Sequence, residues 1–247
     1  MEHKEYKRIN PEARAAVLFV HGIVGTPNHF SELVQLVPNG VSVCNLLLDG
    51  HGGTVRDFSQ TSMKQWEAQV RDAVEELTAT HSKIYIAAHS MGTLFAIDRA
   101  IENEAVKGLF LLAVPLKIAP KPRMVSNLCK VYFDKIKPDD EVALAAKRCY
   151  GIAQDKNPFH YFGWLPRYLE LFAKAKQMRR SVQLLHTPCR AYQSARDELV
   201  SGKSAQLLAK NENISLTELK KSGHYYYDPT DLTFLLNEFQ EFINQIK

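Results

Sequence analysis

The sequence predicts an α/β protein with a mostly parallel β-sheet and helices on both faces of that sheet. Three observations lead to this fold class. Short apolar runs recur along the chain, the runs are nearly continuous rather than alternating, and segments with helical periodicity separate them. With 247 residues, 45% of them hydrophobic, the chain is long enough to form one such domain with a sizeable core.

The first half of the chain contains four predicted strands with helices between them. The strands are AAVLFV (15–20), VSVCNLLLD (41–49), KIYIAA (83–88) and VKGLFLLAVP (106–115). The helices are NHFSELVQLV (28–37), a segment from Ser62 to Thr80, and a segment from Met91 to about Asn103. Ser62 and Gln65 have the spacing of a capping box, which favours a helix that begins there.

The same alternation returns in the last third of the chain. Strands are predicted at PCRAYQS (188–194) and ISLTELK (214–220), with a helix near Lys203 to Lys210 between them. From Leu232 to Ile246, apolar residues recur at steps of three and four. We therefore expect a final helix with one buried face.

The alternation is interrupted between Pro115 and His186, where helical patterns occur without a convincing strand. The two clearest helix candidates there are DDEVALAAKRCYGIA and WLPRYLELFAKAKQM. A helical segment after the fourth predicted strand would lie over the carboxyl ends of the strands, where open α/β sheets bind ligands. We expect residues 1–247 to form a single domain, with 116–186 as a helical cap or lid.

The charge of the chain does not indicate a nucleic-acid-binding protein. The net charge of +4, from 31 basic and 27 acidic residues, is too small to indicate nucleic-acid binding. One basic cluster, formed by Lys174, Lys176, Arg179 and Arg180, is interpreted as the solvated face of a helix. Attraction of an anionic substrate or a lipid surface is the alternative interpretation of this cluster.

Membrane and secretion signals are not recognised in the sequence. No apolar run approaches the roughly 18 residues of a membrane span, so stable membrane insertion is not expected. The first apolar run leads into a predicted strand without a small-residue cleavage site, so no signal peptide is predicted. Four widely spaced cysteines without a Cys-x-x-Cys pair fit reduced thiols, and we expect a cytoplasmic protein.

A candidate nucleophile occurs in AAHSMGT (87–93), where Ser90 lies between a predicted strand and a predicted helix. Ala88-His89-Ser90-Met91-Gly92 differs in one residue from Gly-x-Ser-x-Gly, the motif of a strained turn that exposes a serine hydroxyl. Small residues are needed at both ends because strand and helix pass close together there. The alternative is an ordinary hydroxyl at a strand–helix junction.

Later loops supply the other groups that an activated serine requires. Asp197 follows the strand at 188–194 and His224 follows the strand at 214–220, in the order acid and then base. The oxyanion of a tetrahedral intermediate would accept hydrogen bonds from the backbone N–H groups of Met91 and Ile23. We therefore predict Ser90, Asp197 and His224 as catalytic residues.

Other polar residues near these motifs are interpreted as structural. Glu198 and Asp228 are alternative acids, but Glu198 is expected to face away from the base, and Asp228 is expected to cap the final helix. His21 and His51 are expected to fix loops, and the side chain of His89 is expected to point away from the crevice. None of the nine histidines has a metal-binding spacing, so no metal is predicted.

The chain resembles the α/β-hydrolase superfamily, in particular small bacterial carboxylesterases and monoacylglycerol lipases. The matching segments cover residues 17–228 in the family's order: LFVHGIVGTP, LLLDGHGGTVRDFSQTSMKQW, IAAHSMGT, SARDELV and SGHYYYD. The resemblance implies the same roles for the residues named above. Ala88 replaces the usual first glycine, and the N-terminus is too short for the paired antiparallel strands that open larger members.

These observations predict a serine esterase that acts on a small-molecule carboxylic ester with a small to medium acyl chain. Such an enzyme needs no cofactor, because Ser90, His224 and Asp197 supply the nucleophile, base and acid. Monoacylglycerol lipase, lysophospholipase, thioesterase and acyl or peroxyacid transferase activities would use the same groups. A non-catalytic ligand-binding protein on the same fold is a further alternative. The oligomeric state is not indicated.

Overall fold

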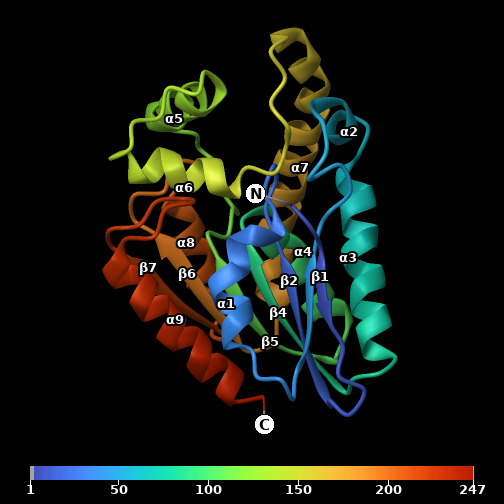
Figure 1. Ribbon diagram of the computed structural model, residues 1–247. Helices are drawn as coiled ribbons and strands as arrows, with labels where there is room; N and C mark the ends of the chain where they lie inside the picture. Colours follow the sequence, from blue (N-terminus) through green and yellow to red (C-terminus); the bar gives the residue numbers. More distant parts are fainter. Residues whose placement is uncertain (1–2, 247) are drawn as a thin grey trace.

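The computed structural model describes residues 3–246, and in that part of the chain seven strands form one sheet. The strand order is β1-β3-β2-β4-β5-β6-β7 (Figure 1). β1 (Tyr6–Arg8) pairs antiparallel with β3, and every other neighbouring pair is parallel. The predicted fold class is confirmed. Residues 1, 2 and 247 of the predicted single domain lie outside the described residues.

Six of the seven strands coincide with predicted segments. They are β2 (Ala15–Val20), β3 (Ser42–Leu46), β4 (Lys83–His89), β5 (Val106–Leu112), β6 (Cys189–Ser194) and β7 (Ile214–Leu219). β3 ends three residues before the predicted end at Asp49, because the Leu48 N–H donates to His21 Nε2 instead of a neighbouring strand. β1 was not predicted, since three exposed or half-buried residues carry no hydrophobic signal.

Helices connect the strands. The connecting helices are α1 (Ser31–Leu36), α2 (Val55–Ser59), α3 (Met63–Thr78), α4 (Met91–Glu102), α8 (Lys203–Leu208) and α9 (Pro229–Asn244), with a 3₁₀ helix, η1 (Pro27–Phe30), before α1. Polar side chains cap the first turn of several of these helices. The unpredicted α2 begins with a capping box of Thr54 and Asp57. The Asp228 side chain accepts from the Thr230 N–H, so Asp228 caps α9 as expected.

The interval between β5 and β6 is helical, in agreement with the sequence pattern. Within the described residues it contains α5 (Pro122–Tyr132), α6 (Glu141–Cys149), η2 (Pro158–Trp164), α7 (Leu165–Ser181) and η3 (Val182–Leu184). We refer to residues 116–186 as the insertion. Its Gly151 N–H donates to the Val24 carbonyl, and the Gly52 N–H donates to the Gly151 carbonyl. The insertion therefore contacts the loops at the carboxyl ends of β2 and β3.

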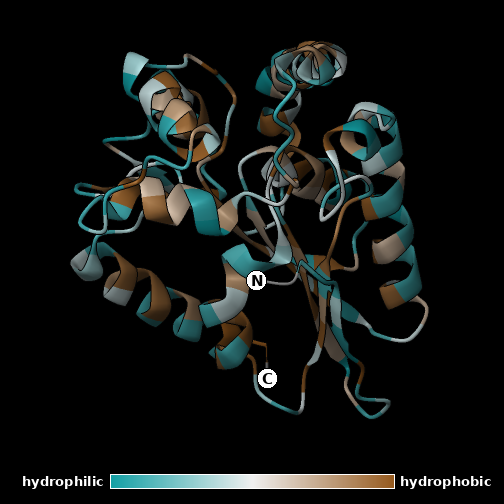
Figure 2. Ribbon diagram, turned by 45° about the horizontal axis from the view of Figure 1, so that its top comes forward, coloured by the Kyte–Doolittle hydropathy of each residue, from teal (hydrophilic) through white to brown (hydrophobic). Residues whose placement is uncertain are grey.

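Helices cover both faces of the sheet, and β2 shows how the sequence sorts its side chains between them. Val17 and Phe19 pack in the cluster with α1 and α9. Leu18 and Val20 point the other way, into the larger cluster with α3, α4, α7 and α8. The outer helices carry both hydrophobic and hydrophilic residues, as helices with one buried face do (Figure 2). No helix of residues 3–246 is long and apolar enough to cross a membrane.

The basic cluster on α7 is solvated only in part: Lys176 and Arg180 are exposed, whereas Lys174 and Arg179 are not, contrary to the interpretation of the sequence. Lys174 is only 5% exposed, and its Nζ lies 2.8 Å from Asp98 Oδ2 on α4 and 2.9 Å from Glu67 Oε1 on α3. Arg179 donates through Nε to the Leu116 carbonyl. The difference arises because α7 packs against α3 and α4, which turns Lys174 toward their carboxylates.

The Lys174→Met substitution is expected to lower the free energy of unfolding by about 3 kcal/mol, because it removes the cation closest to the buried Asp98 carboxylate and leaves only Arg99, whose Nη2 lies 3.6 Å away. Denaturant unfolding measures this change. Lys176→Met on the exposed side of the same helix is the matched control and should change stability by less than about 0.5 kcal/mol. Equal effects of the two substitutions would contradict the importance of this ion pair.

Candidate active site

Ser90 occupies a strained turn between β4 and α4. Its backbone φ is 51° and ψ is −123°, in a region that residues other than glycine rarely adopt. Its N–H donates to the Leu112 carbonyl at 2.9 Å, which ties the turn to β5. The strand–turn–helix context predicted from the sequence is therefore present, and Ser90 is the residue of positive φ in this turn.

Two glycines allow the chain to pass close to this turn. A Cβ on Gly92 would overlap the Val20 carbonyl and lie 2.7 Å from the His21 oxygen. A Cβ on Gly22 would lie 2.9 Å from the Ser90 Cβ. Because no such contact is tolerated, only glycine fits where α4 meets the end of β2. The loop after β2 is thereby held directly beside Ser90.

The structure brings the three predicted catalytic side chains together. His224 Nε2 lies 3.1 Å from Ser90 Oγ, and His224 Nδ1 lies 2.8 Å from Asp197 Oδ2. Asp197 follows β6 and His224 follows β7, so parallel strands deliver all three residues to one edge of the sheet. All three are buried, with Ser90 only 6% exposed. The arrangement can transfer a proton from the hydroxyl to the imidazole.

The Asp197 carboxylate is held in its ionised form. Burial by itself would raise the pKa of Asp197. This effect is outweighed by the electrostatic attraction and hydrogen bond of His224 and by two hydrogen bonds from the N–H groups of Leu199 and Val200. The pKa of Asp197 therefore lies below its ordinary value. The carboxylate can hold the Nδ1–H of His224 and stabilise positive charge on that ring.

Glu198 has a positioning contact that the sequence analysis missed. Its Oε2 accepts a hydrogen bond from the His224 backbone N–H at 2.9 Å, and its side chain is buried. The carboxylate packs against Gly223, where a Cβ would lie 2.9 Å from Oε2. The expectation that Glu198 faces away from the base is therefore wrong. A glycine directly before the candidate base was the available signal for this close approach.

Histidines around the site fix its loops and carry no charge. His89 Nε2 lies 2.9 Å from the His224 carbonyl, and burial lowers the pKa of His89 well below its usual value. His21 accepts from the Leu48 N–H and joins the loops after β2 and β3, and burial lowers its pKa to about 4. His51 Nδ1 lies 3.1 Å from the Leu48 carbonyl. The contacts of His21 and His51 agree with the loop-fixing roles expected for them, and the contact of His89 joins the Ser90 turn to the His224 loop.

The two predicted oxyanion donors lie next to Ser90 in the chain or in space. Met91 is the first residue of α4, where no helical carbonyl accepts its N–H. Ile23 follows Gly22, which lies against the Ser90 Cβ, and the Gly25 N–H closes the loop on the Gly22 carbonyl at 3.0 Å. Both positions suit backbone donors for an anion formed at Ser90.

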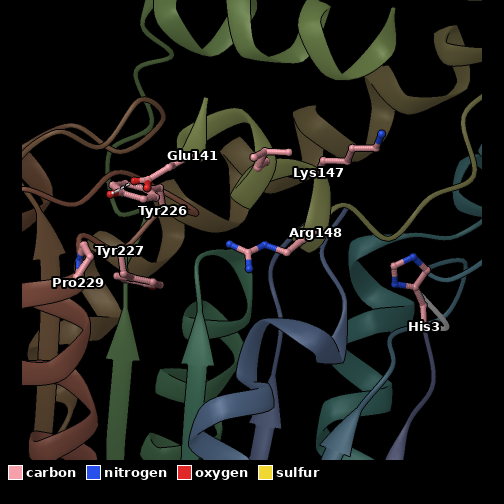
Figure 3. A pocket seen from close by; sticks show the side chains of 8 residues that line it. His3, Glu141, Lys147, Arg148, Tyr226, Tyr227 and Pro229 are labelled. Atoms are coloured by element: carbon pink, nitrogen blue, oxygen red, sulfur yellow. Dashed lines mark hydrogen bonds between the residues drawn. The ribbon is translucent and has the colours of Figure 1, made fainter. Parts of the chain in front are cut away.

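Two hollows flank the His224 loop on its outer side. The larger, of about 620 Å³, is lined by residues of α6 such as Arg148 and by Tyr226, Tyr227 and Pro229 (Figure 3). The smaller, of about 240 Å³, includes His29 and Cys149. Among residues 3–246, no group of three or more His, Cys, Asp and Glu side chains could hold a metal ion.

Comparison with known proteins assigns the chain to a family. Residues 11–226 match the family described as serine aminopeptidase, S33. The chain belongs to this family of α/β hydrolases. The S33 match includes Ser90, Asp197 and His224, as well as the loop after β2 that contains Ile23.

One curated relative of this S33 chain is the thermostable monoacylglycerol lipase of Bacillus sp. (strain H-257), which is 30% identical over 104 residues. The matched region spans 42% of this chain and 40% of that protein, so it covers less than half of the relative's length.

Solved structures share the fold over nearly the whole chain. A structure from work on the metagenome-derived lipolytic enzymes LipS and LipT has a TM-score of 0.76 and 19% identity, covering 99% of this chain and 98% of the other. The monoacylglycerol lipase of Paleococcus ferrophilus has a TM-score of 0.67 and 18% identity over 100% of both chains. Est1E of Butyrivibrio proteoclasticus, with ferulic acid bound, has a TM-score of 0.64 and 18% identity, covering 98% and 94%.

Gly92→Ala is expected to destabilise the protein by about 2 kcal/mol or more, because the new methyl group must displace the backbone at the end of β2. The midpoint of denaturant unfolding measures the effect. At Gly40, a Cβ would meet nothing within 4 Å, so Gly40→Ala is the matched control. Its free energy of unfolding should stay within about 1 kcal/mol of that of the parent protein. A fully stable Gly92→Ala variant would show that the strand and helix are not in this close contact.

Proposed function

We propose that this protein is a serine hydrolase that cleaves carboxylic esters through an acyl-enzyme intermediate. The observation that carries the proposal is the position of His224, which lies within hydrogen-bond distance of both Ser90 Oγ and Asp197 Oδ2. Membership of the S33 family and the lipolytic relatives support ester hydrolysis as the reaction. Ser90 is the nucleophile, His224 the general base and Asp197 the acid.

The reaction follows from the geometry. His224 Nε2 takes the hydroxyl proton as Ser90 Oγ attacks the ester carbonyl carbon. The N–H groups of Ile23 and Met91 hold the oxyanion, while Asp197 stabilises the protonated ring. The alcohol leaves with the proton from His224, and Ser90 remains acylated. Water, deprotonated by His224, then attacks the acyl group, which releases the carboxylic acid and restores the serine.

The acyl chain that we propose is small to medium in length. Aromatic side chains fill the inner side of the insertion: Trp164 packs against Phe58 of α2 at 4.8 Å and against Tyr161 at 4.8 Å between ring centroids. Tyr150 and Ile152 also pack into this cluster. Because these side chains pack against the body of the protein and so limit the space left there for a ligand, we favour a shallow acyl site. We further propose that the insertion forms a lid of the same domain.

Monoacylglycerol lipase is the second candidate function. The curated relative from Bacillus carries that name, and so does one of the solved structures with the same fold. The same proton transfers would release a fatty acid from a glycerol ester. The two candidates differ in the depth of the acyl site, which the length of the preferred acyl chain measures.

Ser90→Ala is expected to reduce kcat for a p-nitrophenyl ester by about 10⁴-fold or more, because no oxygen remains to form the acyl-enzyme. The same variant should lose labelling by a fluorophosphonate probe. Ser82→Ala, at an exposed loop position, is the control and should keep both properties. Full activity of Ser90→Ala would falsify the assignment of the nucleophile, whereas an unreactive parent protein would favour a binding role.

A series of p-nitrophenyl esters tests the acyl preference. We expect kcat/KM to be highest for chains of about two to eight carbons and to fall beyond them, since added methylenes must displace the aromatic cluster around Trp164. Trp164→Ala should shift the maximum to longer chains, while Phe234→Ala, on the exposed side of α9, should leave it unchanged. A maximum near twelve carbons or more, in the parent protein, would instead support a deep site of the lipase kind.

A further inference from the structure

Charge is divided unequally between the insertion and the rest of the molecule. Residues 116–186 contain 14 basic and 6 acidic side chains, a net charge of +8. The remaining residues contain 17 basic and 21 acidic side chains, a net charge of −4. The modest charge of the whole chain therefore conceals a strongly positive segment on a negative body. A difference of this kind indicates a directed electrostatic interaction rather than general solubility.

Helix α5 of the insertion presents apolar side chains to solvent. Val125 and Leu128 on α5 and Phe133 directly after it are 51–62% exposed, while Asn127 and Val131 are buried. Residues 125 and 128 lie one turn apart on the same side of the helix. An ordinary surface helix turns its apolar side toward the core, whereas α5 buries Val131 but leaves Val125 and Leu128 in solvent.

A second exposed apolar group lies beside α5. Phe159, Phe162 and Leu165, on η2 and at the start of α7, are 58–71% exposed. The two groups adjoin, because the rings of Tyr132 and Tyr161 have centroids 5.8 Å apart. Figure 1 shows α5 and the beginning of α7 extending from the same end of the molecule. We refer to these six exposed side chains as the apolar tip.

Exposed cations flank the segments of the apolar tip in the sequence. Lys121 and Arg123 at the start of α5, Lys137 before α6 and Lys156 before η2 are exposed. Among residues 3–246, none of these four forms an ion pair with a carboxylate. Lys130 and Lys147 differ, since they pair with Asp140 and Asp134. Exposed positive charges therefore lie within a few residues of the apolar side chains in the same three segments of the insertion.

We propose that the apolar tip docks on an anionic lipid surface, with the phenylalanines in the interface and the lysines and arginine against the headgroups. Exposed apolar patches of this kind mark interaction sites, and basic residues beside them match the negative charge of anionic lipids. A second copy of this chain is a poorer partner, because a symmetric contact would place the same positive charges against each other. The proposal concerns binding and does not depend on ester hydrolysis.

The test measures sedimentation of the full chain with vesicles of phosphatidylcholine, alone or mixed in equal parts with phosphatidylglycerol. Binding to the mixed vesicles is expected to be much stronger and to weaken as NaCl rises from about 0.1 M to about 1 M. Lys121→Gln with Arg123→Gln should weaken it roughly 25-fold, at about fivefold for each charge. Phe159→Ser with Phe162→Ser should weaken it about tenfold or more.

Matched controls separate the tip from general charge and hydrophobicity. Lys210→Gln with Lys220→Gln removes the same charge from exposed positions outside the insertion, and Phe234→Ser removes an exposed ring from α9. Both controls should keep the parental affinity, with circular dichroism confirming that every variant is folded. Equal binding to the two kinds of vesicle, or equal losses in tip and control variants, would overturn the proposal. The proposal would also be overturned if the parent protein did not bind vesicles but formed a dimer, and if the Phe159→Ser, Phe162→Ser variant no longer formed that dimer.

Discussion

The hydrogen bonds of a single buried residue, His224, join the parts of this fold that matter for chemistry. Its Nδ1 lies against Asp197 and its Nε2 against Ser90, a residue 134 positions earlier in the chain. Its backbone N–H donates to Glu198, and its carbonyl lies 2.9 Å from His89 Nε2. Because an unpaired polar group in so dry a place would cost about 1–3 kcal/mol, these partners fix the loop as well as the ring.

Burial also decides which of the clustered groups carry charge. The pKa of His29 falls to about 3 and that of His89 lies well below its usual value, so these rings stay neutral beside His224. Asp197 keeps its negative charge because its pKa is lowered. Its contribution to stability is therefore present above its unfolded pKa of about 3.9 and is lost as the pH falls through the lower folded value. Asp197 is thus the ionised carboxylate that faces the ring of His224.

Local sequence patterns predicted the parts of the structure whose causes are local. Continuous apolar runs located β2, β4 and β5, and the order of Ser90, Asp197 and His224 after parallel strands was enough to bring them to one edge. β1 was missed because its place depends on pairing with β3 rather than on its own polar side chains. Lys174 was misjudged for a similar reason, since its carboxylate partners come from α3 and α4. Such contacts are set by tertiary packing, which periodicity does not encode.

The insertion is attached to the rest of the molecule through its last long helix, α7, and through its middle, around Gly151. The buried ion pairs of Lys174 hold α7 to α3 and α4, and breaking such a pair is costly. At the other side, Gly151 is held to the loops after β2 and β3 by backbone hydrogen bonds to Val24 and Gly52, each worth about 1 kcal/mol net. The Gly151 N–H donates to the carbonyl of Val24, the residue after Ile23, so this attachment of the insertion lies beside the proposed oxyanion donors.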